Sequence, residues 1–139
     1  MTRLSPQQFY ALKAAPAKRA KYGNKKSANA DSVLEGDRKR QLELMEQAGQ
    51  ITELEFQVDM PLTVNAELVC VYRPDAMYIE NNKQIAEDAK GFKTPAYAIK
   101  AKLFMARYPH IRFAEYRRGK GRIFKKLQNG RLLDDKRQN

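Results

Sequence analysis

The chain has 139 residues, enough for about one domain with a modest core. Its only cysteine, Cys70, excludes an internal disulfide framework and a Cys-rich zinc module, and its only histidine, His110, removes most histidine-based metal and acid–base schemes. No apolar run approaches the roughly 20 residues of a membrane span or the core of a signal peptide, so we expect no membrane partner and a reduced, cytoplasmic compartment.

The net charge of +11 is concentrated at the two ends of the chain. Residues 1–30 carry +7 and residues 117–139 carry +7, whereas the stretch between them carries −3. Phosphate contacts supply most sequence-independent affinity for nucleic acid, so this layout fits a bound polyanion, although basic ends also keep a small protein soluble. We therefore divide the chain into a basic N-terminal arm (1–30), a core (31–116) and a basic C-terminal tail (117–139).

The first predicted elements are helical. A short helix is expected over residues 5–15, followed by a basic arm in which Tyr22 could stack on a base or simply belong to a solvated tail. Ser32 and Glu35 have the spacing of a capping box, which predicts a helix from there to Ala48, ended by Gly49. Capping is a structural role that Glu35 can have without any chemistry.

Strands follow this helix. Alternating apolar and polar residues from residue 54 predict a strand that ends at Pro61. Residues 62–72 predict a second strand, buried on both faces because residues 68–71 are apolar in succession. Residues 75–79 and 84–90 predict a hairpin across a turn at residues 81–83.

The remaining elements are a helix and short strands. Thr94 and Pro95 predict the start of a helix that runs to about Tyr108, buries Ile99, Leu103 and Phe104, and has a basic side that includes Lys100. A strand is expected over residues 111–116, and Asn129-Gly130 indicates a further hairpin between residues 123–124 and 132–133. This order predicts an α/β (α+β-like) fold with a mixed central sheet flanked by helices.

The predicted hairpin brings two carboxylates and a lysine together. Strand residues two apart share a face, so Asp88 and Lys90 point the same way, Glu87 points the other way, and pairing can place Asp75 beside them. Asp75, Asp88 and the backbone carbonyl of Ala89 are hard oxygen donors that suit Mg²⁺ or Mn²⁺. A water on such an ion can attack phosphorus, while Lys90 orients it or stabilises charge on the phosphate.

Each of these residues also has an ordinary structural interpretation. Asp75 follows a proline and can be a turn residue, Asp88 and Lys90 can form a weak ion pair, and Lys90 can be a solvated strand end. Glu35 completes the acidic set, as a direct or water-mediated metal ligand, only if the end of its helix lies against the hairpin. The conjunction of these residues is therefore more informative than any one of them.

Pro74-Asp75 followed by Asp88-Ala89-Lys90 resembles the signature of the PD-(D/E)xK nuclease superfamily, whose fold is a mixed sheet flanked by helices. The wider pattern is similar to small phage-encoded members, including the Holliday-junction resolving endonucleases and a related uncharacterised phage family. The resemblance covers residues 21–116, through the matching segments 22–26, 31–35, 46–49, 72–75 and 87–94. Many such proteins have Glu at the position of Asp88, and the strand alternation favours Asp88 over Glu87.

The resemblance implies a Mg²⁺-dependent endodeoxyribonuclease, encoded by a phage and acting on branched DNA, with Glu35, Asp75, Asp88 and Lys90 as the catalytic set. Cutting a junction on two strands implies a homodimer. The residues expected to contact DNA are Tyr22, Lys25, Lys26, Lys93, Lys100, Arg117, Arg118 and Lys120. The alternatives are a non-catalytic DNA-binding protein that uses its basic arms on a nuclease-like fold, and a phage protein with a structural or partner-binding role.

Overall fold

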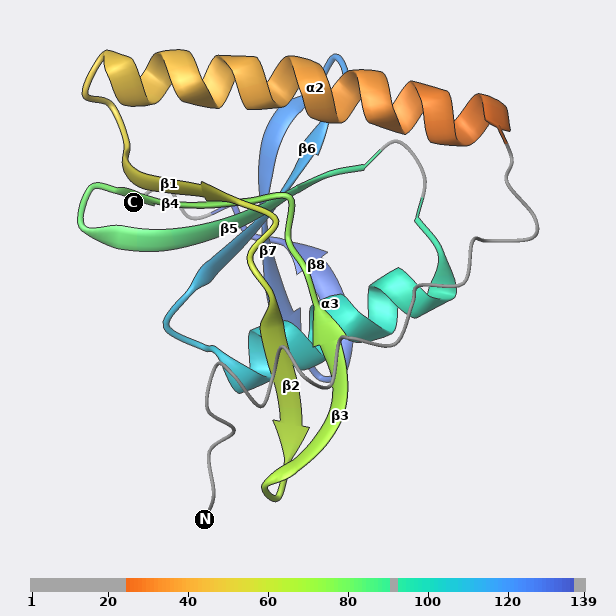
Figure 1. Ribbon diagram of the computed structural model, residues 1–139. Helices are drawn as coiled ribbons and strands as arrows, with labels where there is room; N and C mark the ends of the chain where they lie inside the picture. Colours follow the sequence, from red (N-terminus) through yellow and green to blue (C-terminus); the bar gives the residue numbers. More distant parts are fainter. Residues whose placement is uncertain (1–24, 91–92, 137–139) are drawn as a thin grey trace.

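The computed structural model describes residues 25–90 and 93–136, with side chains from residue 32 onward. The predicted helix over residues 5–15 and Tyr22 lie outside the described residues, as do the side chains of Lys25 and Lys26. Two helices and eight strands follow one another along the described chain (Figure 1). In order, they are α2 (Lys25–Gln47), β1 (Thr52–Phe56), β2 (Met60–Val64), β3 (Glu67–Tyr72), β4 (Ala76–Glu80), β5 (Lys83–Ala89), α3 (Pro95–Arg107), β6 (Arg112–Arg117), β7 (Gly121–Gln128) and β8 (Arg131–Asp134).

Six of these strands form one mixed sheet in the order β1-β4-β5-β6-β7-β8, and β2 pairs with β3 in a separate two-stranded sheet. Strands β5 and β6 run parallel, because the intervening α3 carries the chain back, and the other neighbours are antiparallel. The predicted mixed α+β fold is therefore confirmed. The sheet continues beyond residue 116 through β7 and β8, whose turn is the predicted Asn129-Gly130 hairpin.

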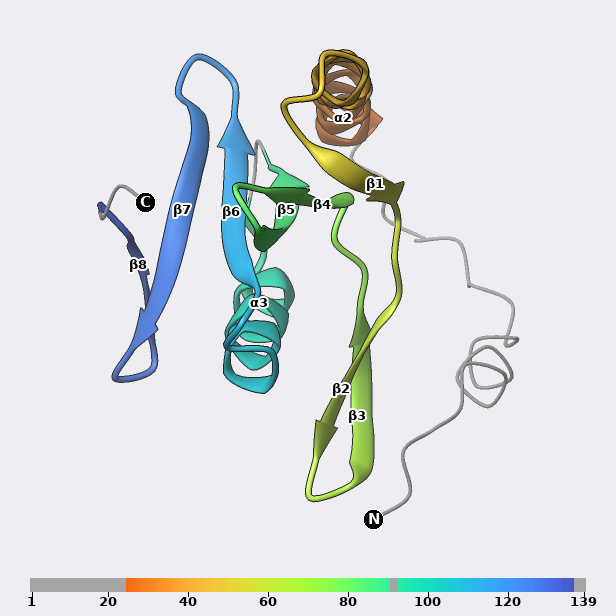
Figure 2. The ribbon, with the colours of Figure 1, turned by 90° about the vertical axis from the view of Figure 1, so that its left-hand side faces the viewer.

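The two helices cover opposite faces of the large sheet (Figure 2). Strand alternation divides the core accordingly, since successive side chains point to opposite faces. The cluster on the α2 side joins Leu42 of α2 to Ile51, Ala76, Tyr78 and Ile85. The cluster on the α3 side joins Tyr97, Ala101 and Phe104 of α3 to Leu62, Tyr72, Met77, Ala86, Ile111 and Phe113. No helix in the described ranges combines the length and the apolar character needed to cross a bilayer.

Helix α2 begins earlier than the capping box predicts. It starts at Lys25, so Ser32 lies two turns inside it and Glu35 is an interior residue, not a capping partner. No proline or glycine interrupts residues 25–35, and most of these residues tolerate a helix, so the local cap motif does not stop it. The end is close to the prediction, with Gln47 as the last helical residue and Gly49 at φ +78°.

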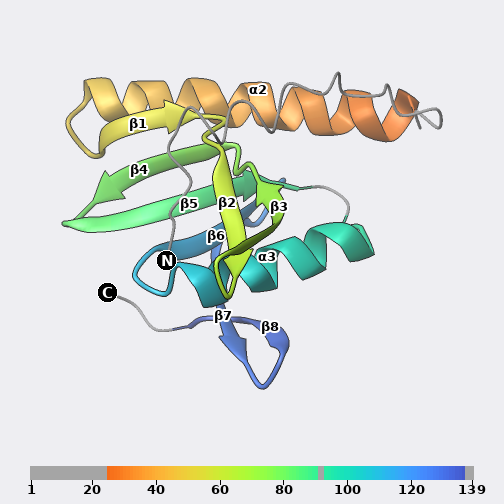
Figure 3. The ribbon, with the colours of Figure 1, turned by 60° about the horizontal axis from the view of Figure 1, so that its bottom comes forward.

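The second prediction that the structure corrects concerns residues 54–72. The predicted continuous strand is broken between β1 and β2, and Pro61 lies inside β2, where a strand without a second neighbour tolerates its missing N–H. Strand β3 is not buried on both faces, since Val69 is 56% exposed. The reason is that β2 and β3 leave the central sheet and form an arm along α3, where Tyr108 Oη donates to the Pro61 carbonyl at 2.7 Å (Figure 3).

Helix α3 begins where the sequence predicts. Thr94 is its N-cap, and the Thr94 side-chain oxygen accepts a hydrogen bond from the Tyr97 N–H at 3.1 Å. Phe104 is buried as predicted, whereas Leu103 is only partly buried and Ile99 is 58% exposed. Tyr97 and Ala101, which the prediction did not include, complete the buried face.

We expect Thr94→Ala to lower the free energy of unfolding by about 1 kcal/mol, because the first turn of α3 loses its side-chain acceptor. Thr94→Ser keeps the hydroxyl and should retain most of the stability. Urea denaturation of the two variants measures the difference. An unchanged midpoint in Thr94→Ala would contradict the role of this cap.

Candidate active site

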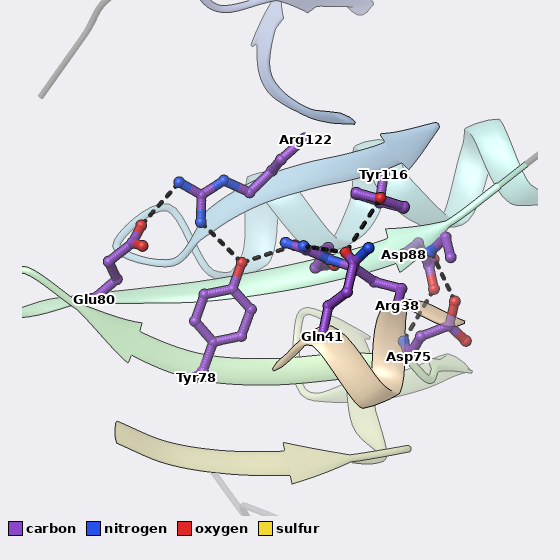
Figure 4. A network of polar contacts seen from close by, with 10 residues as sticks. Arg38, Gln41, Asp75, Tyr78, Glu80, Asp88, Tyr116 and Arg122 are labelled. Atoms are coloured by element: carbon purple, nitrogen blue, oxygen red, sulfur yellow. Dashed lines mark hydrogen bonds and ion pairs between the residues drawn. The ribbon is translucent and has the colours of Figure 1, made fainter. Parts of the chain in front are cut away.

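Asp75 and Asp88 lie in direct contact at one end of the β4–β5 hairpin. Asp88 is on β5 and only 2% exposed, and Asp75 lies just before β4. The Asp75 N–H donates to Asp88 Oδ1 at 3.0 Å, and the Ala89 N–H donates to Asp75 Oδ2 at 2.8 Å (Figure 4). These reciprocal hydrogen bonds fix the two carboxyl groups side by side, as the predicted hairpin pairing requires.

The contact between the two carboxyl groups is electrostatically unfavourable when both are charged. Burial raises the pKa of Asp88 well above its ordinary value, and the neighbouring Asp75 carboxylate raises it further. Burial also raises the pKa of Asp75, against the lowering effect of the Ala89 N–H. Lys90 lowers the pKa of both carboxyl groups, which places its positive charge near the pair.

Asp88 and Lys90 share the face of the sheet that α3 covers. The Tyr72 hydroxyl donates a hydrogen bond to Asp88 Oδ2, and the Lys90 Nζ lies 5.1 Å from the centre of the Tyr97 ring. The two tyrosine rings are themselves neighbours, with centroids 6.5 Å apart. The predicted common face of Asp88 and Lys90 is therefore confirmed by their contacts. The sequence did not indicate the two tyrosines.

Glu87 points to the opposite face, toward α2, as the alternation predicts. It is 1% exposed and accepts two hydrogen bonds from Arg38, at 2.7 Å and 2.9 Å, and one from Tyr78 Oη at 2.7 Å. Three donors and a full positive charge satisfy this carboxylate, so it is already occupied by protein groups. Asp88, not Glu87, is the acid that lies beside Asp75.

The contacts of Glu87 extend into a polar network on the α2 face (Figure 4). Arg122 donates to Tyr78 Oη at 3.1 Å and pairs with Glu80 at 2.9 Å. On the other side, the Arg38 guanidinium lies 4.3 Å from the centre of the Tyr116 ring. The network ties α2 to strands β4, β5, β6 and β7.

Glu35 lies one turn before Arg38 on α2 and reaches the same end of the sheet. With Asp75, Ala89 and Arg38, it lines a cavity of about 200 Å³ between α2 and the sheet. Asp88 does not line this cavity, because its side chain faces α3. The structure thus brings Asp75, Asp88 and Lys90 together and places Glu35 across a shared cavity from Asp75.

The donor chemistry of the carboxyl pair fits a hard divalent cation. Two adjacent carboxylates and the Ala89 carbonyl are oxygen ligands, and an ion such as Mg²⁺ takes one or two carboxylates while it keeps several waters. In the part of the chain that the structure describes, no three Asp, Glu, His or Cys side chains form a metal-binding group. The carboxylate and carbonyl oxygens of Asp75, Asp88 and Ala89 are hard donors, which suit magnesium better than zinc.

Several of the basic residues predicted to contact DNA surround this end of the sheet. Arg117, Arg118 and Lys120 lie at the turn between β6 and β7, and the Lys90 N–H donates to the Tyr116 carbonyl next to that turn. Lys93 precedes α3 and pairs with Glu115 at 3.1 Å, whereas Lys100 is half-buried on α3. A larger cavity of about 620 Å³ lies at the other end of β5, lined partly by Lys83, Arg112 and Lys126.

We expect the carboxyl pair to make stability depend on pH in the absence of metal. A folded-state pKa raised above the unfolded value gives stability that is present below pH 4 and lost as pH rises through the raised pKa. Asp88→Asn keeps an acceptor for the Asp75 N–H and removes one charge. It should therefore reduce the decrease in stability as the pH rises. At pH 7 it should raise the free energy of unfolding by about 1.4 kcal/mol for each unit of pKa shift removed.

Urea unfolding in EDTA at a series of pH values measures this effect. The matched control is Asp37→Asn, which removes an exposed carboxylate from α2 and should leave the pH profile as it is in the wild type. A profile for Asp88→Asn as steep as that of the wild type would contradict the repulsion between Asp75 and Asp88.

Comparison with known proteins adds one match. A family model described as "Protein of unknown function (DUF1064)" matches residues 17–121. No curated protein and no solved structure gives a significant match. The matched range includes Glu35, the Asp75–Asp88 pair and Lys90.

Proposed function

The chain belongs to the DUF1064 family, whose description gives no activity. From its residues and from the resemblance that they carry, we propose that it is a metal-dependent endodeoxyribonuclease that hydrolyses phosphodiester bonds in branched DNA. The observation that carries the proposal is the buried contact between Asp75 and Asp88, with Lys90 beside them. Backbone hydrogen bonds hold two carboxyl groups together although their charges repel, which lowers the free energy of unfolding. A protein that did not use the pair would gain nothing from this loss of stability.

In this proposal, Asp75, Asp88 and the Ala89 carbonyl hold Mg²⁺ or Mn²⁺, and Glu35 contributes across the cavity, directly or through water. The ion supplies Lewis acidity and a water of lowered pKa when it is bound. Lys90 stabilises negative charge that develops on the phosphate oxygens, since its positive charge acts on both carboxyl groups of the pair. The Tyr72 hydroxyl orients Asp88 through its hydrogen bond.

The preference for DNA is supported by charge. The chain carries +11 overall, and Lys93, Arg117, Arg118 and Lys120 lie around the end of the sheet that holds the carboxyl pair. Phosphate contacts from such residues supply most sequence-independent affinity. Four further parts of the proposal are supported only by the resemblance to junction-resolving endonucleases. They are the preference for branched DNA, the phage origin, the bacterial cytoplasm as the site of action and the homodimer with paired sites.

The test is a cleavage panel. Purified protein is incubated with end-labelled duplex, single-stranded, flap and four-way DNA, with Mg²⁺, Mn²⁺ or EDTA. We expect metal-dependent cleavage, fastest on the four-way and flap substrates. Absence of cleavage on every substrate with either metal would refute the nuclease proposal, and equal cleavage of all forms would refute the preference for branches.

A non-catalytic DNA-binding protein is the second candidate. The observation in its favour is that the described residues hold no group of three metal-ligating side chains, and Glu35 is separated from the pair by a cavity. This candidate predicts salt-sensitive binding of DNA without cleavage, unaffected by Asp75→Asn and Lys90→Ala. Deleting residues 1–26 should weaken that binding.

A further inference from the structure

Glu115 is a buried carboxylate next to the candidate site that the proposed reaction does not use. It lies on β6 directly opposite Asp88 in the parallel β5–β6 pairing, and it is 0% exposed. Neighbouring strands lie about 4.8 Å apart, so Glu115 and Asp88 are one strand spacing from each other. Tyr97 donates to Glu115 at 2.8 Å, and the Tyr97 ring also lies beside Tyr72, which bonds to Asp88.

Three cations converge on this one carboxylate. The Glu115 Oε1 lies 3.1 Å from Lys93 Nζ, 3.4 Å from the Arg117 guanidinium and 3.6 Å from Lys125 Nζ. Burial raises the pKa of Glu115, but the Tyr97 hydroxyl and the lysines outweigh it, so the pKa lies below its usual value. Glu115 is therefore a carboxylate, and it offsets only one of the three positive charges.

The remaining positive charge lies on the side that water reaches. Lys125 is nearly buried, with its side chain 8% exposed, and it also pairs with Asp134. The side chains of Lys93 and Arg117 are 35% and 31% exposed. They share the charge of Glu115 with Lys125, and Asp134 also acts on both, so two carboxylates face three cations. A planar guanidinium and an ammonium held side by side, with donors to spare, match the oxygens of a phosphate group.

We propose that Lys93 and Arg117 form a binding site for a backbone phosphate of DNA, adjacent to the phosphate at Asp75 and Asp88, and that Glu115 is the positioning residue that holds both cations in place. This inference rests on the proposed function, because Glu115, which holds both cations, lies one strand spacing from Asp88 of the carboxyl pair. The inference assigns Glu115 a role in binding. A buried ion network that served only stability would need one cation to neutralise this carboxylate, whereas Glu115 has several.

The test is the salt dependence of DNA binding, measured in EDTA so that no cleavage is needed. Fluorescence anisotropy of a labelled four-way DNA, over a series of KCl concentrations, gives the slope of log K against log salt. Each lost phosphate contact should reduce that slope by about 0.9 for duplex arms. Arg117→Gln and Lys93→Gln are each expected to show part of this reduction, and the double variant, which loses the whole site, the full reduction.

The matched control is Arg131→Gln, which removes an exposed cation from the β7–β8 turn, at the other end of the sheet, and should leave the slope unchanged. Glu115→Gln separates positioning from simple charge. It makes the protein more positive, so charge alone predicts tighter binding, whereas loss of positioning predicts weaker binding. Circular dichroism confirms that each variant is folded.

The possible outcomes distinguish this site from the nuclease proposal. An unchanged slope in both Arg117→Gln and Lys93→Gln would overturn the phosphate site, even if the wild type cleaves DNA. Tighter binding by Glu115→Gln would overturn its positioning role. A reduced slope in a protein that cleaves nothing would support the phosphate site and refute the nuclease.

Discussion

Replacing Asp75 by Asn is expected to reduce metal-dependent cleavage of DNA at least about a thousandfold, equivalent to about 4 kcal/mol of transition-state stabilisation, with little change in DNA affinity. The amide keeps the size of the side chain and an acceptor for the Ala89 N–H, so the hairpin should stay intact. It removes the negative charge that a divalent ion needs next to Asp88. The loss should therefore appear in the rate of cleavage and not in binding.

Two further variants sharpen this expectation. Asp88→Asn should abolish cleavage in the same way, and Lys90→Ala should lower the rate about a hundredfold or more, because a group that stabilises charge in the transition state is removed. Asp37→Asn is the matched control, since it removes an exposed carboxylate from α2. Single-turnover cleavage with Mg²⁺ gives the rates, and isothermal titration with Mn²⁺ gives metal affinity without DNA.

A cleavage rate in Asp75→Asn within tenfold of the wild type would contradict the assignment of the metal site. Retained Mn²⁺ affinity in both Asp75→Asn and Asp88→Asn would do so independently of any activity. If cleavage fell as far in Asp37→Asn as in Asp75→Asn, the loss would follow from removing any carboxylate and would not be specific to the pair.

Arg38→Ala is expected to have the largest effect on stability, a loss of about 3–5 kcal/mol in the free energy of unfolding. The variant leaves the Glu87 carboxylate buried, without the guanidinium that gives it two hydrogen bonds. Arg38 also lies over the Tyr116 ring, so α2 loses packing as well as charge. Cleavage should fall too, because Arg38 holds the part of α2 that carries Glu35.

The double variant Arg38→Met, Glu87→Leu is the control for the ion pair. Replacing both partners by apolar residues removes the uncompensated charge, so most of the lost stability should return. Urea unfolding of the wild type and of the two variants measures the free energies. A loss below about 1 kcal/mol in Arg38→Ala would contradict the role of this ion pair in stability.

Short-range patterns predicted the hairpin that carries the carboxyl pair and the start of α3. The side-chain period of a strand is two, so it separates Glu87 from Asp88 and joins Asp88 to Lys90 without any tertiary information. Thr94 and Pro95 likewise combine an N-cap side chain with a first-turn proline. The contacts of these residues in the structure agree with the predicted faces and the predicted helix start.

Other features depend on contacts that no local pattern contains. Arg38 and Glu87 are 49 residues apart, and nothing in either segment names the other as its partner. Tyr72 ends β3 and is close in sequence to Asp75, which is the one signal that could have linked it to the site. The capping box at Ser32 was misleading, because residues before it also favour a helix and the helix continues through them.

The β4–β5 hairpin also influences the order in which the candidate site assembles during folding. Only 13 positions separate Asp75 from Asp88, whereas 49 separate Arg38 from Glu87. Because the entropy of loop closure grows with the logarithm of loop length, the longer closure costs about 1.2 kcal/mol more. We therefore expect the carboxyl pair to form with the local hairpin, before α2 docks and brings Glu35 to the shared cavity.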